Sequence, residues 1–176
     1  MTELVGKIDP NAPRKPGDLT IYGLIPTDVP SLREPNGQGS KGGKVGAHGV
    51  HCGNQILLYT DHPDVKLYIE DGKANGAKGF NTCTTLDATT KQIEMVITAA
   101  KAMGYVADIV VDPTYPWFVD IETARFLDPT KVQVVWEVKQ GDKVLCMREQ
   151  ITFGWVLGTK TDPMFRYITS MLKLAE

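Results

Sequence analysis

Short runs of mostly apolar, β-branched residues recur along this chain, and they restrict it to folds built around a sheet. Leu19–Ile25 and Tyr105–Val111 are the clearest runs, and each has the length of a strand. Because Leu19–Ile25 is largely apolar, it is expected to be covered on both faces, which is typical of a sheet flanked by helices. No run approaches the roughly 18 apolar residues that a membrane helix requires.

Segments with helical spacing separate these runs. The clearest helix has apolar residues at the i, i+3, i+4, i+7 positions, namely Ile93, Val96, Ile97, Ala100 and Met103. Asp87, Thr89 or Thr90 can cap its start, and Gly104 marks its end. A second helix is expected from Lys44 to about Tyr59, and a third begins with Asp162 as N-cap and Pro163 at the first helical position.

The remaining segments complete an alternation of strands and helices. Strands are expected at 80–86, at 132–138 and 144–147 around the turn Gln140-Gly141-Asp142, and at 151–157. Residues 62–77 are expected to form a polar connection. The strand that begins at Tyr105 is expected to end at Asp112-Pro113, since proline cannot donate to a ladder.

This order predicts an α/β fold, a three-layer α/β/α sandwich with a mixed central sheet and an additional β-hairpin insertion. Residues 1–18 contain Pro10, Pro13 and Pro16 and are expected to be an extended lead-in. Residues 19–176 are expected to form a single domain, with the insertion at about 117–148.

Composition narrows the class of protein further. With 176 residues, 42% hydrophobic content and a formal net charge of -2, the chain suits one folded domain and lacks the basic excess of a general nucleic-acid coat. Any contact with nucleic acid must therefore be local. The three cysteines are widely spaced, so no disulfide framework is expected, and the start of the chain does not resemble a secretory signal. We expect a cytoplasmic protein without a membrane partner.

A glycine-rich stretch precedes the second helix and ends at Gly43-Lys44. It is not a nucleotide-binding P-loop, because Gln38 stands where that motif needs glycine and Val45 where it needs Ser or Thr. Lys41, Lys44 and the amides of a helix start can still form a small anion site. The alternative is a solvated, flexible loop.

Three further side chains could carry chemistry. His48 and His51 stand three residues apart on one expected helix, but a zinc site needs three or four ligands, so packing or substrate contact is favoured and no metal is expected. Asp112 ends a strand, where ligands of open α/β sheets gather, although an aspartate before proline also commonly begins a turn. If the strands that precede Lys44 and Asp112 are parallel neighbours, the two side chains converge on one cleft.

Three stretches in this order resemble the type 2 peptidyl-tRNA hydrolases, the archaeal and eukaryotic class of that activity. Residues 43–51 resemble the family's Gly-Lys-Val/Ile-Ala-Ala-Gln-x-x-His helix start, and 105–112 resemble the strand that leads to its Asp-Ala-Gly motif. Residues 168–174 are similar to its closing Val-Thr-Gly-x-Leu-Lys-Leu. The chain departs from the family at His48, where the family has glutamine, and at Asp112-Pro113-Thr114.

The resemblance implies hydrolysis by water of the ester between a peptide and tRNA, with no covalent intermediate, cofactor or required metal. It assigns functional roles to Lys44 and Asp112, and a hydroxyl role to Thr152. The residues expected to contact peptidyl-tRNA, or a related nucleotide-containing ligand, are Lys41, Gly43, His48, His51, Thr114 and Tyr115.

Two other readings remain open from the residues. The chain could keep the scaffold but use the same cleft only to bind a nucleotide-like anion, a tRNA end or a protein partner. It could also be an interaction module whose hairpin provides an edge for self-association, so a homodimer is possible.

Overall fold

The computed structural model describes residues 19–29, 41–74, 83–159 and 161–174, which leaves the expected lead-in at 1–18 outside the described residues. The chain divides into two compact units, a first unit of residues 1–110 with 153–176 and a second unit of residues 111–152. The second unit contains the whole segment expected as an insertion at about 117–148. That it interrupts a family pattern stays a prediction.

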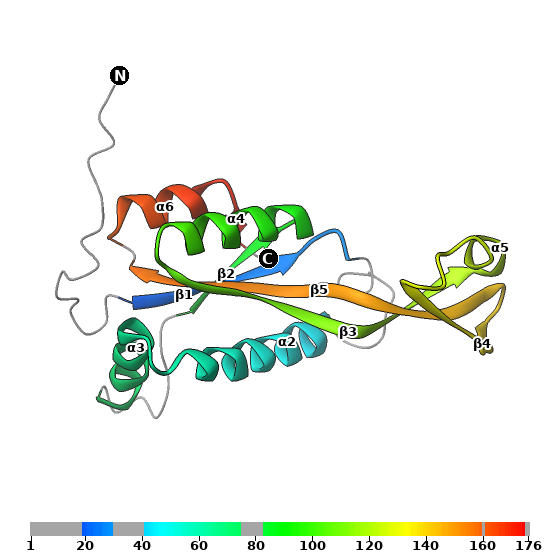
Figure 1. Ribbon diagram of the computed structural model, residues 1–176, viewed down its shortest axis with the longest axis horizontal. Coiled ribbons are helices and arrows are strands. Elements are labelled where there is room, and N and C mark those ends of the chain that lie inside the picture. The colour runs from blue at the N-terminus through cyan, green and yellow to red at the C-terminus, as the bar shows by residue number, and fades with distance from the viewer. Residues whose placement is uncertain (1–18, 30–40, 75–82, 160, 175–176) are drawn as a thin grey trace, which may run out of the picture. The chain divides into compact units, whose positions relative to one another are not determined.

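Helices and strands alternate along the first unit (Figure 1). In chain order the elements of the whole chain are β1 (Leu19–Pro26), α2 (Lys41–Ile56), a 3₁₀ turn η1 (Leu57–Tyr59), α3 (Pro63–Ala74), β2 (Cys83–Ala88), α4 (Thr90–Ala102), β3 (Val106–Asp120), α5 (Ile121–Ala124), β4 (Val132–Gln140), β5 (Lys143–Thr159), α6 (Pro163–Ser170) and β6 (Lys173–Leu174).

The strands form a mixed sheet in the order β3-β5-β1-β2-β6, with β4 pairing with β5. β1 runs parallel to β2 and antiparallel to β5, while β6 runs antiparallel to β2. The predicted α/β class and the mixed sheet are therefore confirmed. The condition set for convergence of Lys44 and Asp112, that the strands before them are neighbours, is not met, because β5 lies between β1 and β3.

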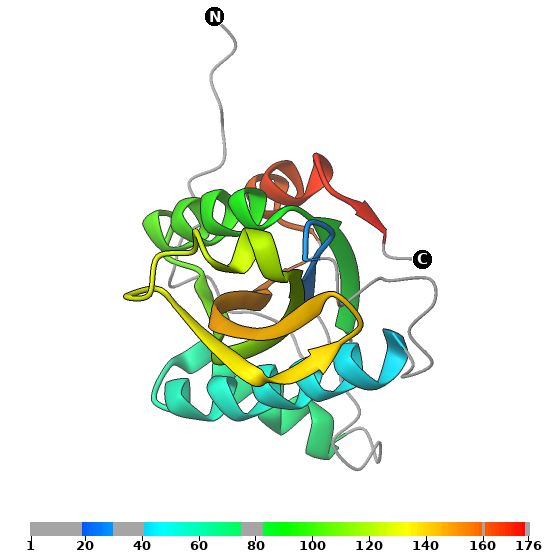
Figure 2. The same cartoon turned by 90° about the vertical axis from the view of Figure 1, so that its right-hand side faces the viewer.

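Each face of the sheet in the first unit is covered by helices (Figures 1 and 2). On one face, Cys52 and Ile56 of α2 and Val65 of α3 pack in one core cluster with Ile21 and Trp155 of the sheet. On the other face lie α4 and α6. Strand β1 is buried along nearly its whole length, as expected for a strand covered on both faces.

Local capping explains where two helices begin. Thr89 accepts a hydrogen bond from the Gln92 amide and Gln92 accepts one from the Thr89 amide, which makes the capping box at the start of α4. Asp162 caps α6 by accepting from the amides of Met164 and Phe165, with Pro163 in the first turn. Both starts agree with the sequence-based expectation.

Three sequence-based expectations about elements were wrong. Residues 63–74 form helix α3, in which Val65 and Tyr68 are buried. β3 does not end at Asp112-Pro113 but continues to Asp120. It is an edge strand, and an edge strand tolerates proline because one of its sides has no neighbouring strand to receive an N–H. The strands expected at 144–147 and 151–157 are one strand, β5.

The second unit is a ribbon of β3, β5 and β4 with the short helix α5. Buried Ala124, Val144 and Cys146 form its small core, against which Trp117 and Leu127 pack. β4 and β5 pair antiparallel around Gly141, whose φ of +63° suits the tight turn expected there. A register shift between Val135 and Lys139 interrupts the pairing, and Trp136 and Val138 in this bulge are 43% exposed.

Among the described residues, no helix combines the length and the apolar character needed to cross a membrane.

Gly158 and Gly53 provide a matched pair for testing the packing of the first unit. A Cβ at Gly158 would lie 2.4 Å from ring atoms of the fully buried Phe165, whereas a Cβ at Gly53 on α2 would meet nothing within 4 Å. We predict that Gly158→Ala lowers the free energy of unfolding by about 1–3 kcal/mol through overpacking. Gly53→Ala should raise it by about 0.5–1 kcal/mol, as alanine is the better helix former. Urea unfolding measures both, and equal effects would contradict this packing.

Candidate functional site

The candidate residues occur in two groups. Residues 41–51 of the first group lie in α2 of the first unit, and Asp112, Thr114, Tyr115 and Thr152 lie in the second unit. The side chains of Lys41, Lys44 and His48, and the environment of Gly43, lie outside the described residues. His51 is exposed on α2. The expected convergence of Lys44 and Asp112 on one cleft therefore stays a prediction.

Asp112 and Thr114 lie together. The Asp112 carboxylate accepts a hydrogen bond through Oδ1 from the backbone N–H of Thr114 at 2.8 Å, and the Thr114 hydroxyl lies 3.5 Å from the same oxygen. This is the local turn that an aspartate makes with the residue two positions later. Within the described part of the chain, the other oxygen, Oδ2, has no hydrogen-bond partner. Asp112 is half-buried, so water can reach its side chain. The bond to Thr114 holds the carboxylate in one orientation.

Tyr115 and Thr152 differ from these two residues in exposure. Tyr115 is 4% exposed and Thr152 is 1% exposed. Both side chains are buried. The expected substrate contact of Tyr115 and the expected catalytic role of the Thr152 hydroxyl stay predictions.

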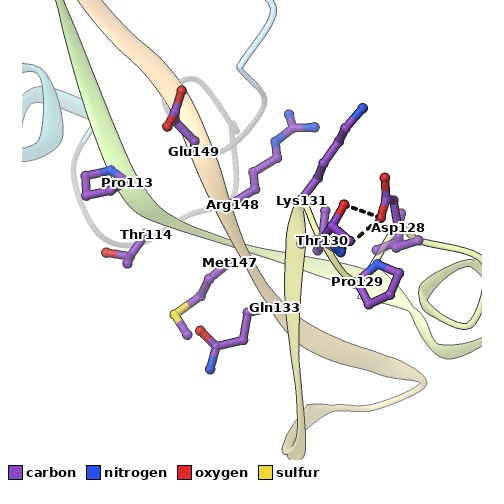
Figure 3. A pocket seen from close by; sticks show the side chains of 12 residues that line it. Pro113, Thr114, Asp128, Pro129, Thr130, Lys131, Gln133, Met147, Arg148 and Glu149 are labelled. Carbon is purple, nitrogen blue, oxygen red and sulfur yellow. Dashed lines mark hydrogen bonds between the residues drawn. The ribbon is translucent and has the colours of Figure 1, made fainter.

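An open pocket of about 810 Å³ lies within the second unit (Figure 3). Its walls come from the turn after Asp112, from the segment that leads into β4, and from β5. The lining residues are Pro113, Thr114, Leu127, Asp128, Pro129, Thr130, Lys131, Val132, Gln133, Met147, Arg148 and Glu149. Thr114 links this pocket to the Asp112 carboxylate.

The pocket is bordered by two copies of one tripeptide. Asp112-Pro113-Thr114 recurs as Asp128-Pro129-Thr130. In the second copy, the Asp128 carboxylate accepts hydrogen bonds from the Thr130 amide at 2.9 Å and from its hydroxyl at 2.7 Å (Figure 3). These bonds lower the pKa of Asp128. The repeat is the sequence feature that could have located this pocket, and our sequence analysis missed it.

Arg148 and Lys131 are the cations of the pocket. The Arg148 guanidinium lies 4.8 Å from the centre of the Trp117 ring and donates a hydrogen bond to Oε1 of Gln150 at 2.8 Å. Figure 3 shows the side chains of Arg148 and Lys131 extending to the same side of β5. Two carboxylates, Asp128 and Glu149, also line the pocket, so its formal charge is balanced.

A polar network in the first unit holds α2 and η1 on the sheet. Gln55 accepts a hydrogen bond from the Trp155 indole at 2.9 Å and donates one to the Ile109 carbonyl at 2.8 Å. Tyr59 donates to Asp108 at 2.6 Å, and Lys101 forms an ion pair with the same carboxylate at 3.0 Å. The network therefore connects α2 and η1 with β3, β5 and α4.

Two pKa shifts follow from this network. Burial raises the pKa of Asp108, but hydrogen bonds from Tyr59, Lys101 and the Ile109 amide outweigh it and leave that pKa below its ordinary value. The bond to Asp108 is the main reason that the pKa of Tyr59 is raised to about 12, with burial adding to it. Both shifts stabilise the neutral phenol beside the ionised carboxylate.

Burial raises the thiol pKa of all three cysteines. Burial raises the pKa of the Cys52 thiol to about 12, which keeps it protonated. Among the residues that the structure describes, no group of three or more His, Cys, Asp or Glu side chains is placed to hold a metal ion.

Comparison of the chain with protein-family models and with curated proteins found no match.

Asp108→Asn tests the network. Loss of the charge-assisted bonds should lower the free energy of unfolding by about 1–3 kcal/mol at pH 7. Because the folded pKa of Asp108 lies below the unfolded value, this stabilisation is complete above about pH 4 and disappears as the pH falls further. Thermal unfolding of both proteins from pH 7 to pH 3 measures the difference. Asp61→Asn, at an exposed position, is the control and should change little; a constant difference down to pH 3 would contradict the role of Asp108.

Proposed function

We propose that this chain is a peptidyl-tRNA hydrolase-like esterase, which uses an activated water molecule to cleave the ester between a peptide and the terminal ribose of tRNA. The proposal includes the finer description of the fold, a three-layer α/β/α domain with an inserted β-hairpin. The resemblance to the type 2 family supports it, and its three stretches belong to α2, to β3 with the residue before it, and to the segment from α6 to β6.

The state of Asp112 is the observation that carries the proposal. Its Oδ1 is held by the Thr114 amide at 2.8 Å, while Oδ2 has no hydrogen-bond partner among the described residues. A carboxylate that is oriented in this way can orient a water molecule or accept its proton. Attack of that water on the ester carbonyl would break the bond to the ribose oxygen, which leaves with a proton.

Lys44 is the second residue to which the resemblance assigns a functional role. Its ammonium would hold a phosphate of the substrate or stabilise the negative charge that develops on the carbonyl oxygen during attack. Both roles require a positive charge, and α2 contains no acidic residue that would compete for it.

The first test replaces Asp112 with asparagine, which keeps an oxygen for the turn with Thr114 and removes the base. We expect the kcat for release of peptide from an N-acylated aminoacyl-tRNA to fall about 100-fold or more. Asp120→Asn, at an exposed aspartate at the end of the same strand, should retain activity.

Unchanged turnover in Asp112→Asn would overturn the assignment of this residue. Tight binding of peptidyl-tRNA by the unaltered protein without any turnover would instead favour the alternative, a binding protein that has lost the chemistry.

The second test replaces Lys44 with methionine, which keeps the length of the side chain and removes its charge. We expect kcat for the same substrate to fall about 100-fold, the effect of losing one group that stabilises an oxyanion. Lys44→Arg should recover part of the loss. Lys66→Met, at an exposed lysine of α3 in the same unit, is the matched control; equal losses in both methionine variants would rule out a specific role for Lys44.

A further inference from the structure

The two cations of the second-unit pocket, Arg148 and Lys131, are not paired with the carboxylates that line it with them. Among the residues that the structure describes, neither Arg148 nor Lys131 forms an ion pair with a carboxylate, although both lie in the pocket wall with Asp128 and Glu149. Asp128 directs Oδ1 to Thr130 instead. In Figure 3 the Glu149 carboxylate lies apart from the two cationic groups, on the side of Pro113.

The Arg148 side chain is already oriented. Trp117 supports one face of the guanidinium at 4.8 Å, and Gln150 accepts from its NH2 group. Gln150 is itself fixed, because it donates to the Ile151 carbonyl at 3.1 Å. The other N–H groups of Arg148 have no partner among the described residues. A ligand would therefore meet a planar guanidinium that is already held in place and has free donors.

Lys131 is next in the chain to the residue that pairs with Arg148, and both residues line the pocket. Val132 is the cross-strand partner of Arg148, and Lys131 precedes Val132. The turn at Asp128 fixes this arrangement, since the Asp128 carbonyl accepts hydrogen bonds from the amides of Lys131 and Val132 at 3.0 and 2.9 Å. The two cations thus come from neighbouring positions, Lys131 just before β4 and Arg148 on β5 opposite the first residue of β4.

Thr114 links the pocket of these cations to the candidate carboxylate. It lines the same pocket as Arg148 and Lys131, and its backbone N–H holds Asp112. A substrate whose reacting ester lies at Asp112 would therefore continue into a pocket that carries two positive charges. With two carboxylates also in the lining, the pocket suits a single phosphate group rather than a broad polyanionic surface.

We propose that Arg148 and Lys131 bind one phosphodiester of the single-stranded 3′ end of an RNA substrate. The inference rests on the proposed function for the identity of the ligand, and it assigns to the second unit the binding of the RNA end beside Asp112. The planar Arg148 fork donates to phosphate oxygens, and Lys131 adds a second charge. A single phosphate contact of this kind would also allow a chain of net charge -2 to bind RNA locally.

The experiment measures binding of a labelled ACCA tetraribonucleotide to the full chain by fluorescence polarisation at several salt concentrations. Arg148→Gln and Lys131→Gln should each weaken binding about tenfold. Each should also reduce the slope of log K against log salt by about 0.7, the value for one phosphate contact on a single strand. Arg148→Lys should keep the slope but bind more weakly than the unaltered protein, because lysine lacks the planar fork.

Lys143→Gln is the matched control, an exposed cation on the same strand outside the pocket, and it should change neither affinity nor slope. Arg148→Gln that binds ACCA like Lys143→Gln would overturn the proposal. Binding of inorganic phosphate that depends on Arg148, without binding of ACCA, would overturn the assignment to RNA. Circular dichroism confirms folding, and Lys131→Gln tests the site without disturbing the Trp117 contact.

The binding assay needs no turnover, so the two proposals can fail separately. If Asp112→Asn leaves turnover unchanged while ACCA binding depends on Arg148, the catalytic assignment fails and the RNA site stands. If Arg148→Gln affects neither ACCA binding nor the KM for peptidyl-tRNA while Asp112→Asn abolishes turnover, the RNA site fails alone.

Discussion

The hydrogen bond between the Trp155 indole and Gln55 is the interaction on which the arrangement of the first unit depends. Trp155 is fully buried in the sheet, where an unpaired N–H would be costly, and Gln55 of α2 supplies its acceptor at 2.9 Å. The same Gln55 amide donates to the Ile109 carbonyl of β3, the edge strand. One side chain therefore satisfies a buried donor, covers a strand edge and fixes the helix that carries Lys44.

The second unit achieves its order by different means. Its core is small, and two Asp-Pro-Thr turns, a cation–π contact and a tight hairpin turn hold the side chains around the pocket. The turns are local contacts, whereas the cation–π contact joins β3 to β5. The two Asp-Pro-Thr turns and the cation–π contact each order a charged side chain before any ligand arrives. Such a unit can present oriented charges without the extensive burial found around β1. This agrees with the two proposed roles of the unit, catalysis at Asp112 and binding of the RNA end at Arg148.

Several elements could be predicted because their causes lie within a few residues. The cap of α4 at Thr89, the cap of α6 at Asp162 and the turn at Gly141 each depend on short-range hydrogen bonds or on backbone conformation. Helix α3 was missed because its large apolar residues lie within the five positions 65–69, in a segment that otherwise consists of charged and small residues. The continuation of β3 past Pro113 was missed because its position at the edge of the sheet is not a property of those residues.

The candidate site also has features that the sequence determines and features that only the tertiary structure decides. The sequence by itself determined that Asp112 comes directly after the apolar run at 105–111, that Thr114 stands two residues later, and that the charge allows only a local contact with nucleic acid. Only the tertiary structure decided that β5 separates β1 from β3, and that Arg148, Trp117 and Lys131 gather at one pocket with Thr114. Turns and caps arise from neighbours in the chain, whereas strand order and pocket walls depend on which distant surfaces can be buried together.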